Sequence, residues 1–301
     1  MAAEGGSALA APPLPAARPV RAAPSFAELE RELPWHAAAR WRFAAASAAT
    51  RAAARLSDGL AVGYAEGFDS GPFMEHVYRD EARGRTPLGR LLDRRLLDRP
   101  TCVAFRDIKD LARRALDAAL DAQGGRALVA DLAAGHAPYL LDVLEARPEV
   151  HALIGDIDAR ALAVARARAE RLGVAARVGT RCADAFDRRA LEGLTPRPDI
   201  VLELGLYGMV HDDARLERHF RDLAETIEPA QILFNLHTAN PEIEHIARVW
   251  RTREGARCVW RLRPLDRVLG WAAAAGYAPA SVAADRHGIY RVVRLVRAGA
   301  R

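Results

Sequence analysis

The sequence predicts an α/β fold in which a doubly wound sheet of seven strands follows an N-terminal helical cap. Two observations support this prediction. After residue 126, short apolar runs alternate with amphipathic helical segments, a pattern typical of parallel strands joined by helical crossovers. Before residue 126, helical periodicity dominates and no such series of strands occurs. At 301 residues the chain is long enough for one such domain and a smaller appendage.

Composition limits the classes of protein to consider. No run of about 18 apolar residues occurs, so we expect neither a transmembrane span nor a membrane partner. The formal charge of +5 comes almost entirely from arginines interleaved with Asp and Glu, which favours a solvated surface over nucleic-acid binding. The cysteines Cys102, Cys182 and Cys258 form no CxxC pair and predict buried thiols in a reducing, cytoplasmic compartment.

The part of the chain before the sheet divides in two. Residues 1–24 are rich in Ala, Pro and Gly without helical periodicity, and they predict a disordered leader. Residues 25–125 predict a helical cap or lid that begins at Ser25, a candidate N-cap, and ends near two glycines. Its large apolar side chains near the start are expected to pack in a core: Trp35, Trp41 and Phe43.

Residues 126–301 predict the Rossmann-like domain. The candidate strands are the apolar runs ALVADL, VHALIGDI, ARVGTRCA, PDIVLEL, QILFNLH, RCVWRL and YRVVRLV. Amphipathic helices, for example over residues 159–173 and 213–227, separate most of them. Because ligands of such sheets bind at the carboxyl ends of the strands, the site is expected in the loops that follow these runs.

The loop after the first strand, DLAAGHAP at residues 131–138, resembles a phosphate-binding turn but contains only one glycine, Gly135. A dinucleotide-binding GxGxxG turn uses its later glycines for approach of the pyrophosphate and for helix packing. Ala137 and Leu140 occupy those positions here, and Pro138 has no amide N–H to donate. NAD and FAD are therefore disfavoured.

The next three strand ends carry groups that suit a nucleoside. Asp156 can accept hydrogen bonds from both hydroxyls of a ribose. Asp184 can accept from the amino group of adenine, while the backbone of Ala185 and Phe186 addresses the ring. The small and apolar residues of LELGLY, Leu204 among them, can close over the ligand. Together these features describe a nucleoside without phosphate.

The motifs DLAAGHA, GDID, ADAF and LELGLY resemble those of class I S-adenosylmethionine (SAM)-dependent methyltransferases. The stretches GFDSGPFMEHVYRDEARGRTPLGRLLDR, GLYGMVHDDARLERHFRDLAETIEP and NPEIEHIARVW resemble a bacterial "putative methyltransferase" branch that is sometimes fused to an α/β-hydrolase. This resemblance extends from about residue 60 to the C-terminus. It implies SAM as the cofactor.

The resemblance also implies roles for individual residues. Gly135 would lie at the methionine part of SAM, with Asp131 helping to hold its amino group. The implied cofactor-binding set is Asp131, Ala133, Gly135, Asp156, Ile157, Asp184, Ala185, Phe186 and Leu204. Two departures from the branch affect the methionine and acceptor side: Ala137 replaces a second glycine, and the fifth strand ends in FNLHTANPE.

Substrate-binding candidates come from both parts of the chain. Tyr78 and Arg79, in the VYR motif of the branch, would close the pocket from the cap, since an arginine fork can orient a carboxylate. Alternatively, Arg79 pairs in solvent with a neighbouring acid. Asn235 and Asn240 follow the fifth strand and are the other two candidates.

Transfer of a sulfonium methyl needs mainly alignment and exclusion of water, with a base where the acceptor must lose a proton. The candidates for this catalytic role are Tyr207, His211 and His237, although a lone histidine is more often a cap or a satisfied polar group. Asp212 and Asp213 are more typical of a helix cap than of metal ligands, and we expect no metal.

The leading functional hypothesis is methyl transfer from SAM to a small polar acceptor, such as methionine, another amino acid or a natural-product intermediate. One alternative is a SAM cyclase or lyase that forms azetidine-2-carboxylate and methylthioadenosine. Another is an RNA methyltransferase or a catalytically silent SAM-binding module. The apolar helices near residues 35–60 are compatible with a lid or with a homodimer contact.

Overall fold

A single seven-stranded sheet organises the structure, a computed structural model that describes residues 23–299. The strand order is β3–β2–β1–β4–β5–β7–β6, and only β7 runs antiparallel to its neighbours. The strands are β1 (Ala127–Asp131), β2 (Val150–Asp156), β3 (Val178–Cys182), β4 (Ile200–Glu203), β5 (Gln231–His237), β6 (Tyr277–Ala284) and β7 (Tyr290–Arg297). The order changes direction between β1 and β4, which is where a doubly wound sheet binds its ligand. The predicted fold class is confirmed.

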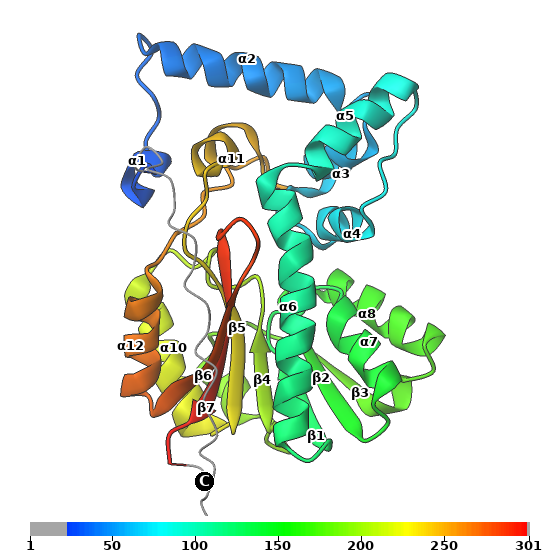
Figure 1. Cartoon of the computed structure of the whole chain (residues 1–301), viewed down its shortest axis with the longest axis vertical. Coiled ribbons are helices and arrows are strands. Elements are labelled where there is room, and N and C mark those ends of the chain that lie inside the picture. Colours follow the sequence, from blue (N-terminus) through cyan, green and yellow to red (C-terminus); the bar gives the residue numbers. More distant parts are fainter. Residues whose placement is uncertain (1–22, 300–301) are drawn as a thin grey trace, which may run out of the picture.

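Helices cover both faces of the sheet (Figure 1). One face carries α6 (Pro100–Ala122), α7 (Pro138–Ala146) and α8 (Ala159–Arg171), and a 3₁₀ turn (Ala175–Arg177) precedes β3. The other face carries α9 (Arg188–Glu192), α10 (Asp213–Thr226) and α12 (Leu265–Ala274). Alternate strand residues therefore point into two separate cores, as the near-continuous apolar runs of the strands require.

A third core lies in the helical cap at the carboxyl ends of the strands. The cap helices are α1 (Phe26–Glu30), α2 (Ala38–Ala53), α3 (Asp58–Glu66), α4 (Gly71–Arg79) and α5 (Pro87–Leu97), joined by α11 (Ile243–Val249) from the second half of the chain. The rings of Phe68 and Trp250 stack with centroids 4.9 Å apart and link these two parts of the sequence. The C-terminal half of the chain therefore helps to build the cap.

Helix α6 belongs both to the cap and to the sheet. It begins under α4 and α5 and continues along β5 and β7, over a length of about 35 Å (Figure 1). In the described residues no strand precedes β1. The division into a cap (25–125) and a Rossmann-like domain (126–301) stays a prediction, with α6 spanning the boundary. The predicted leader, 1–24, falls almost entirely outside the described residues.

Local signals explain several helix starts. Ser25 caps α1 in a reciprocal capping box with Glu28, as the sequence predicts. Asp212 caps α10 by accepting from the N–H of Ala214 at 2.9 Å, so the capping interpretation of this acid is confirmed. None of the helices in residues 23–299 has the length and apolar character needed to cross a bilayer.

One strand assignment is wrong. Residues 257–262, RCVWRL, form an irregular segment in which Trp260 packs into the core of the cap. The sixth strand is instead residues 277–284, YAPASVAA, which lies at the sheet edge with a bulge between Pro279 and Ser281. An edge strand has one neighbour and one exposed side, so it tolerates proline and small residues and carries no strong apolar signal.

Two burial expectations are also wrong. Trp35 and Trp41 are 75% and 64% exposed. Trp35 lies in the turn before α2, and Trp41 is on the side of α2 away from Phe43 and Ala46, which pack on the cap. Cys182 is exposed at the end of β3, whereas Cys102 and Cys258 are buried as predicted.

Candidate cofactor and active site

The loop after β1 and the acid at the end of β2 are joined by a hydrogen bond. The N–H of Gly135 donates to one carboxylate oxygen of Asp156 at 2.7 Å, and the N–H of Asp158 donates to the other oxygen at 2.8 Å. Each oxygen keeps a lone pair that can accept from a ribose hydroxyl. Gly135 has φ of 54°, and no atom lies within 4 Å of where a Cβ would stand, so a ligand can approach its backbone. This geometry fits the ribose and methionine part of SAM.

Asp131, at the end of β1, is fully buried below this loop. It accepts hydrogen bonds from the hydroxyl of Tyr139 and from the N–H of Ala133, the latter at 3.3 Å. Burial raises the pKa of Asp131 to about 7. A ligand ammonium near this carboxyl would favour its ionised form, so the position suits the amino group that the sequence assigns to it.

The expected adenine side presents an apolar side chain beside polar groups. Ile157, directly after Asp156, is 74% exposed, which is unusual for a large aliphatic residue at the end of a buried strand. Asp184 accepts from the N–H of Phe186 at 2.9 Å and from Arg215 at 2.7 Å. The guanidinium of Arg215 also lies 4.5 Å from the centroid of the Phe186 ring.

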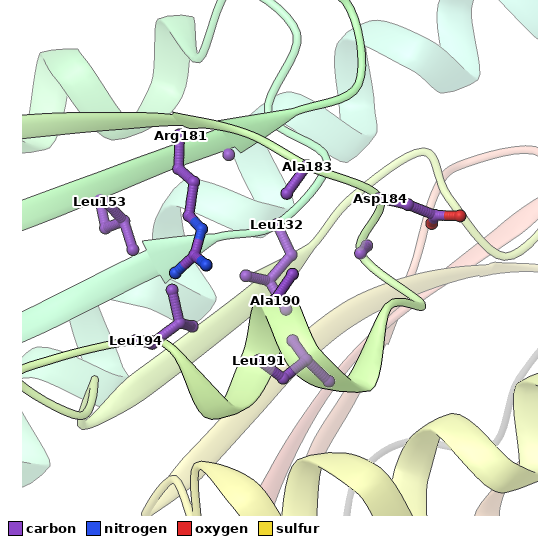
Figure 2. A pocket seen from close by; sticks show the side chains of 10 residues that line it. Leu132, Leu153, Arg181, Ala183, Asp184, Ala190, Leu191 and Leu194 are labelled. Atoms are coloured by element: carbon purple, nitrogen blue, oxygen red, sulfur yellow. The ribbon is translucent and has the colours of Figure 1, made fainter.

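A small apolar pocket lies between the ends of β2 and β3 and helix α9. Figure 2 shows leucines and alanines lining it, with the guanidinium of Arg181 directed among them and the carboxylate of Asp184, at the rim, directed away. Ala185 forms part of the lining and is almost fully buried. Of the three residues predicted on the adenine side, Asp184 and Ala185 therefore line the pocket. The ring of Phe186 instead packs against His219 of α10, with ring centroids 4.5 Å apart.

The loop after β4 forms the opposite wall. Gly205 has φ of 79°, again with no atom within 4 Å of a Cβ position, and its N–H donates to the side-chain oxygen of Asn235 at 2.6 Å. Leu204 packs partly into the core beneath α7. The substrate candidate Asn235 thus fixes the turn that faces the glycine loop of β1.

Helix α4 of the cap lies directly over the glycine loop. A Cβ on Gly71 would stand 2.9 Å from Nε2 of His136, so the two segments are in close contact. Nδ1 of His136 lies 3.6 Å from Glu75, and Glu75 also pairs with the exposed side chain of Arg79. Arg79 therefore neither points into a pocket nor pairs with Asp80 or Glu81, but it is connected to the cofactor loop through Glu75.

Tyr78, the second cap candidate, packs against the cap core, with Nζ of Lys109 5.6 Å from its ring centroid. Burial raises the pKa of Tyr139 and Tyr290 well above the ordinary value, and the nearby phenol of Tyr78 adds to the rise in both. Burial also raises the pKa of Tyr78 itself. Tyr78 therefore lies close to Tyr139, which holds Asp131.

Tyr207 points away from this cleft. Its hydroxyl donates to the buried Glu203 at 2.5 Å and its ring stacks on Phe234, in the core under α10. His219 binds the same carboxylate. Glu203 was not among the residues predicted from the sequence, although an acid inside the apolar run VLELG is a signal of a buried polar network.

His237 is held as a neutral side chain. The N–H of Glu242 donates to the side-chain oxygen of Asn240 at 2.8 Å, so the amide nitrogen of Asn240 faces Nε2 of His237 at 3.2 Å and donates to it. His237 therefore carries its proton on Nδ1. Burial lowers its pKa to about 3, and its ring stacks on Tyr290 at 4.3 Å.

His211 lies on the far side of its loop. Its Nε2 donates to the carbonyl of Val259 at 2.9 Å, and its ring contacts Phe26 of α1. The structure does not bring Tyr207, His211 and His237 together: Tyr207 and His237 lie on opposite faces of the sheet. In residues 23–299 no three His, Cys, Asp or Glu side chains are placed to hold a metal ion.

A further contact, not predicted from the sequence, joins the cap to the loop after β2. Arg253, after α11, pairs with Glu66 of the cap and lies 3.7 Å from Asp158, which follows the ribose-side acid Asp156. Nothing in the local sequence RTREG distinguishes Arg253 from the many surface arginines, because the contact depends on how the segment after α11 is placed beside α3 and the end of β2.

Comparison with known proteins identifies the family. The sequence model of the family described as "Putative methyltransferase" matches residues 15–297. The uncharacterized protein YnbC of Escherichia coli K12 is 32% identical over 251 residues, which are 80% of this chain and 42% of that protein. The chain thus spans less than half the length of this curated relative.

Solved structures share the fold. A possible exported protein from Bordetella parapertussis is similar with a TM-score of 0.60 at 21% identity, over 75% of this chain and 79% of that one. Magnesium protoporphyrin IX methyltransferase (ChlM) from Synechocystis PCC 6803, solved with bound SAM, is similar with a TM-score of 0.52 at 13% identity, over 77% and 93%. The chain therefore belongs to the Putative methyltransferase family, and its fold is similar to that of a methyltransferase solved with bound SAM.

Proposed function

We propose that the protein methylates a small polar acceptor that binds between α4 of the cap and the loops after β4 and β5. The observation that carries this proposal is the position of α4, in contact with the glycine loop at Gly71 and His136. A helix in that place favours a small acceptor next to the methionine end of the cofactor, because it obstructs a large duplex.

SAM supplies a methyl group that is already activated by its sulfonium charge. The contribution of this chain is then to hold SAM and the acceptor in position and to exclude water from the reacting groups. Asp156 and the backbone at Gly135 hold the ribose and methionine parts, and Ile157 covers one side of the adenine. Tyr78 and Asn235 border the acceptor space, whose walls include the stacked rings of His237 and Tyr290.

The polar groups near this space favour an acceptor that needs no protein base. His237 keeps its only unprotonated nitrogen in the hydrogen bond with Asn240. Tyr207 donates to Glu203 on the other face of the sheet. A thioether, such as that of methionine, or a carboxylate attacks without losing a proton. We therefore propose an acceptor of this class. His237 and Tyr207 then hold the site in shape and do not act as the base.

The decisive experiment has two stages. Calorimetry and thermal-shift measurements with SAM test the cofactor site by comparing the parent protein with Asp156→Ala. The control variant is Glu149→Gln, which neutralises an exposed carboxylate at the far end of β2. Mass spectrometry then follows adenosylhomocysteine in a panel of thioethers, carboxylates, amines and phenols. Adenosylhomocysteine that forms only with thioethers or carboxylates supports the proposal, and turnover of amines or phenols alone contradicts the acceptor class.

Incubation with SAM alone tests the alternative reaction. Methylthioadenosine released without any acceptor would indicate cyclisation or elimination within SAM, and it would replace the methyltransferase proposal. A SAM-binding protein that forms neither product with any acceptor would be a silent module.

We also propose a cytoplasmic location. The three cysteines are unpaired, and Cys182 is exposed, which suits a reducing compartment. Cell fractionation with a marker for each compartment tests this, and recovery of the protein outside the cytoplasm would contradict it.

A further inference from the structure

The outer helix of the cap is rich in arginine and free of acid. Between residues 33 and 57 the chain contains no Asp or Glu and four arginines, Arg40, Arg42, Arg51 and Arg55. Only Arg40 has an acidic neighbour within residues 23–299, at 3.8 Å from Glu32. This segment is therefore a concentrated positive charge with almost no acidic partner.

Large apolar side chains are exposed at the same end of the molecule. Four of the eight large hydrophobic residues exposed in the described chain are Trp35, Trp41, Leu88 and Leu91. The indole N–H of Trp41 donates to the carbonyl of Trp35 at 3.0 Å, which holds both residues at the start of α2. Gly89 of α5 packs against the carbonyl of Leu56, so the two leucines stand beside the other end of α2.

Helix α2 itself is unpartnered on its outer side. None of its 16 residues is fully buried, and its outer face carries alanines between Trp41 and Ala52. Figure 1 shows α2 lying across the extremity of the cap, on the side away from the sheet. The helix is about 24 Å long, so it offers a convex strip of indole, alanine and arginine.

The charge of this strip selects among the surfaces that could cover it. A two-fold contact with a second copy would place four arginines against the same four arginines with no acid between them. Single-stranded nucleic acid is bound by proteins in basic grooves lined with aromatic rings, whereas this strip is convex. Exposed indoles flanked by arginine on a helix that lies flat are typical of contact with the headgroups of an anionic bilayer.

We propose that the outer face of α2, with Trp35 and Trp41, docks on an anionic lipid surface so that the cap faces the membrane. The arginines meet the headgroup phosphates and the indoles enter the interface. The absence of a transmembrane span does not bear on such binding. This inference does not depend on the acceptor, and it revises the expectation that the protein has no membrane partner.

The test is co-sedimentation of the full chain with vesicles of pure phosphatidylcholine and with vesicles that contain one third phosphatidylglycerol. We expect binding only to the anionic vesicles, and loss of binding as the ionic strength is raised from about 0.05 to about 0.5 M. Reversing the charge of Arg42 and Arg55 to Glu should weaken binding by about 100-fold or more. Arg51 is left in place, because its guanidinium lies 5.3 Å from the ring centroid of Tyr64 in the cap. The double variant Trp35→Ala, Trp41→Ala should lose binding too. The matched control reverses two exposed arginines elsewhere: Arg218 and Arg221.

Each other outcome overturns the proposal. Failure of the parent protein to bind anionic vesicles at low salt removes it directly. A concentration-dependent dimer by light scattering, lost in the tryptophan variant, assigns the face to a second copy. Single-stranded RNA that binds the parent and displaces it from vesicles assigns the face to nucleic acid. Equal loss of vesicle binding in the control variant shows that total charge, and not α2, is responsible.

Discussion

The backbone N–H of Gly135 and the carboxylate of Asp156 are joined across 2.7 Å, although they follow different strands. The glycine loop of β1 and the acid of β2 therefore form one preorganised unit before a ligand arrives. The N–H of Asp158 holds the second oxygen of the same carboxylate, which fixes its plane. A ribose that binds this acid is thus placed relative to Gly135 as well.

Asp156→Ala should abolish tight SAM binding. The substitution removes the acceptor of two backbone N–H groups and of the ribose hydroxyls, and charged hydrogen bonds contribute about 1.5–3 kcal/mol each. We expect at least a 100-fold rise in the dissociation constant by calorimetry. Asp212→Ala is the matched control, since it removes a side-chain cap, that of α10, at a cost of about 1 kcal/mol in unfolding free energy. Unchanged affinity in Asp156→Ala would show that SAM binds elsewhere.

Ile157→Ser should separate cofactor binding from stability. At 74% exposure the side chain contributes little to the folded core, so the melting temperature without ligand should not change. Loss of apolar cover from adenine should weaken SAM binding by roughly 10-fold. Val164→Ser, at another exposed aliphatic position, should leave both quantities unchanged. A stability loss without an affinity loss would assign Ile157 to packing.

Ala137 occupies a backbone conformation that favours glycine. Its φ of 45° lies in the left-handed region, and the residue is completely buried at the start of α7. Ala137→Val should lower the unfolding free energy by about 2 kcal/mol or more, because a β-branched residue is strained there and the site is full. Ala137→Gly should leave it within about 1 kcal/mol of the parent. Urea unfolding measures both, and a valine variant as stable as the glycine variant would contradict the geometry.

The sequence predicts the layout of this protein better than its catalytic groups. Parallel strands are buried on both sides, so their apolar runs and the acids at their ends are visible in the sequence, as at Asp131 and Asp156. The edge strand β6 lacks that signal because only one neighbour pairs with it. The burial of the parallel strands explains why they were predicted correctly, and the edge position of β6 explains why it was missed.

Side-chain direction was the harder property to predict. Tyr207 lies in the loop after β4 and His237 is the last residue of β5, yet their side chains face opposite sides of the sheet. Which side of the sheet a residue faces depends on the register of its strand and loop. The contact of His136 with Glu75 depends in addition on packing between segments that are distant in the sequence. Neither is encoded in a local motif.

Asp131→Asn should change stability in a pH-dependent way. Burial raises the pKa of this carboxyl to about 7, against about 3.9 in the unfolded chain. The folded protein therefore keeps a proton that the unfolded chain loses, and the free energy of unfolding falls as pH rises from about 4 to about 7. The full effect, up to about 4 kcal/mol, is present at pH 8. Asparagine carries no charge and avoids this loss, so the variant should be more stable than the parent at pH 8 and similar near pH 4.

The same variant should bind SAM more weakly at pH 8, since it lacks the carboxylate that faces the ligand ammonium. Urea unfolding across this pH range, with Glu149→Gln as the control, measures the first effect, and calorimetry measures the second. If Asp131→Asn is less stable than the parent at pH 8, the carboxylate is ionised in the free protein. Tyr139 and the N–H of Ala133 would then stabilise its charge more than burial opposes it.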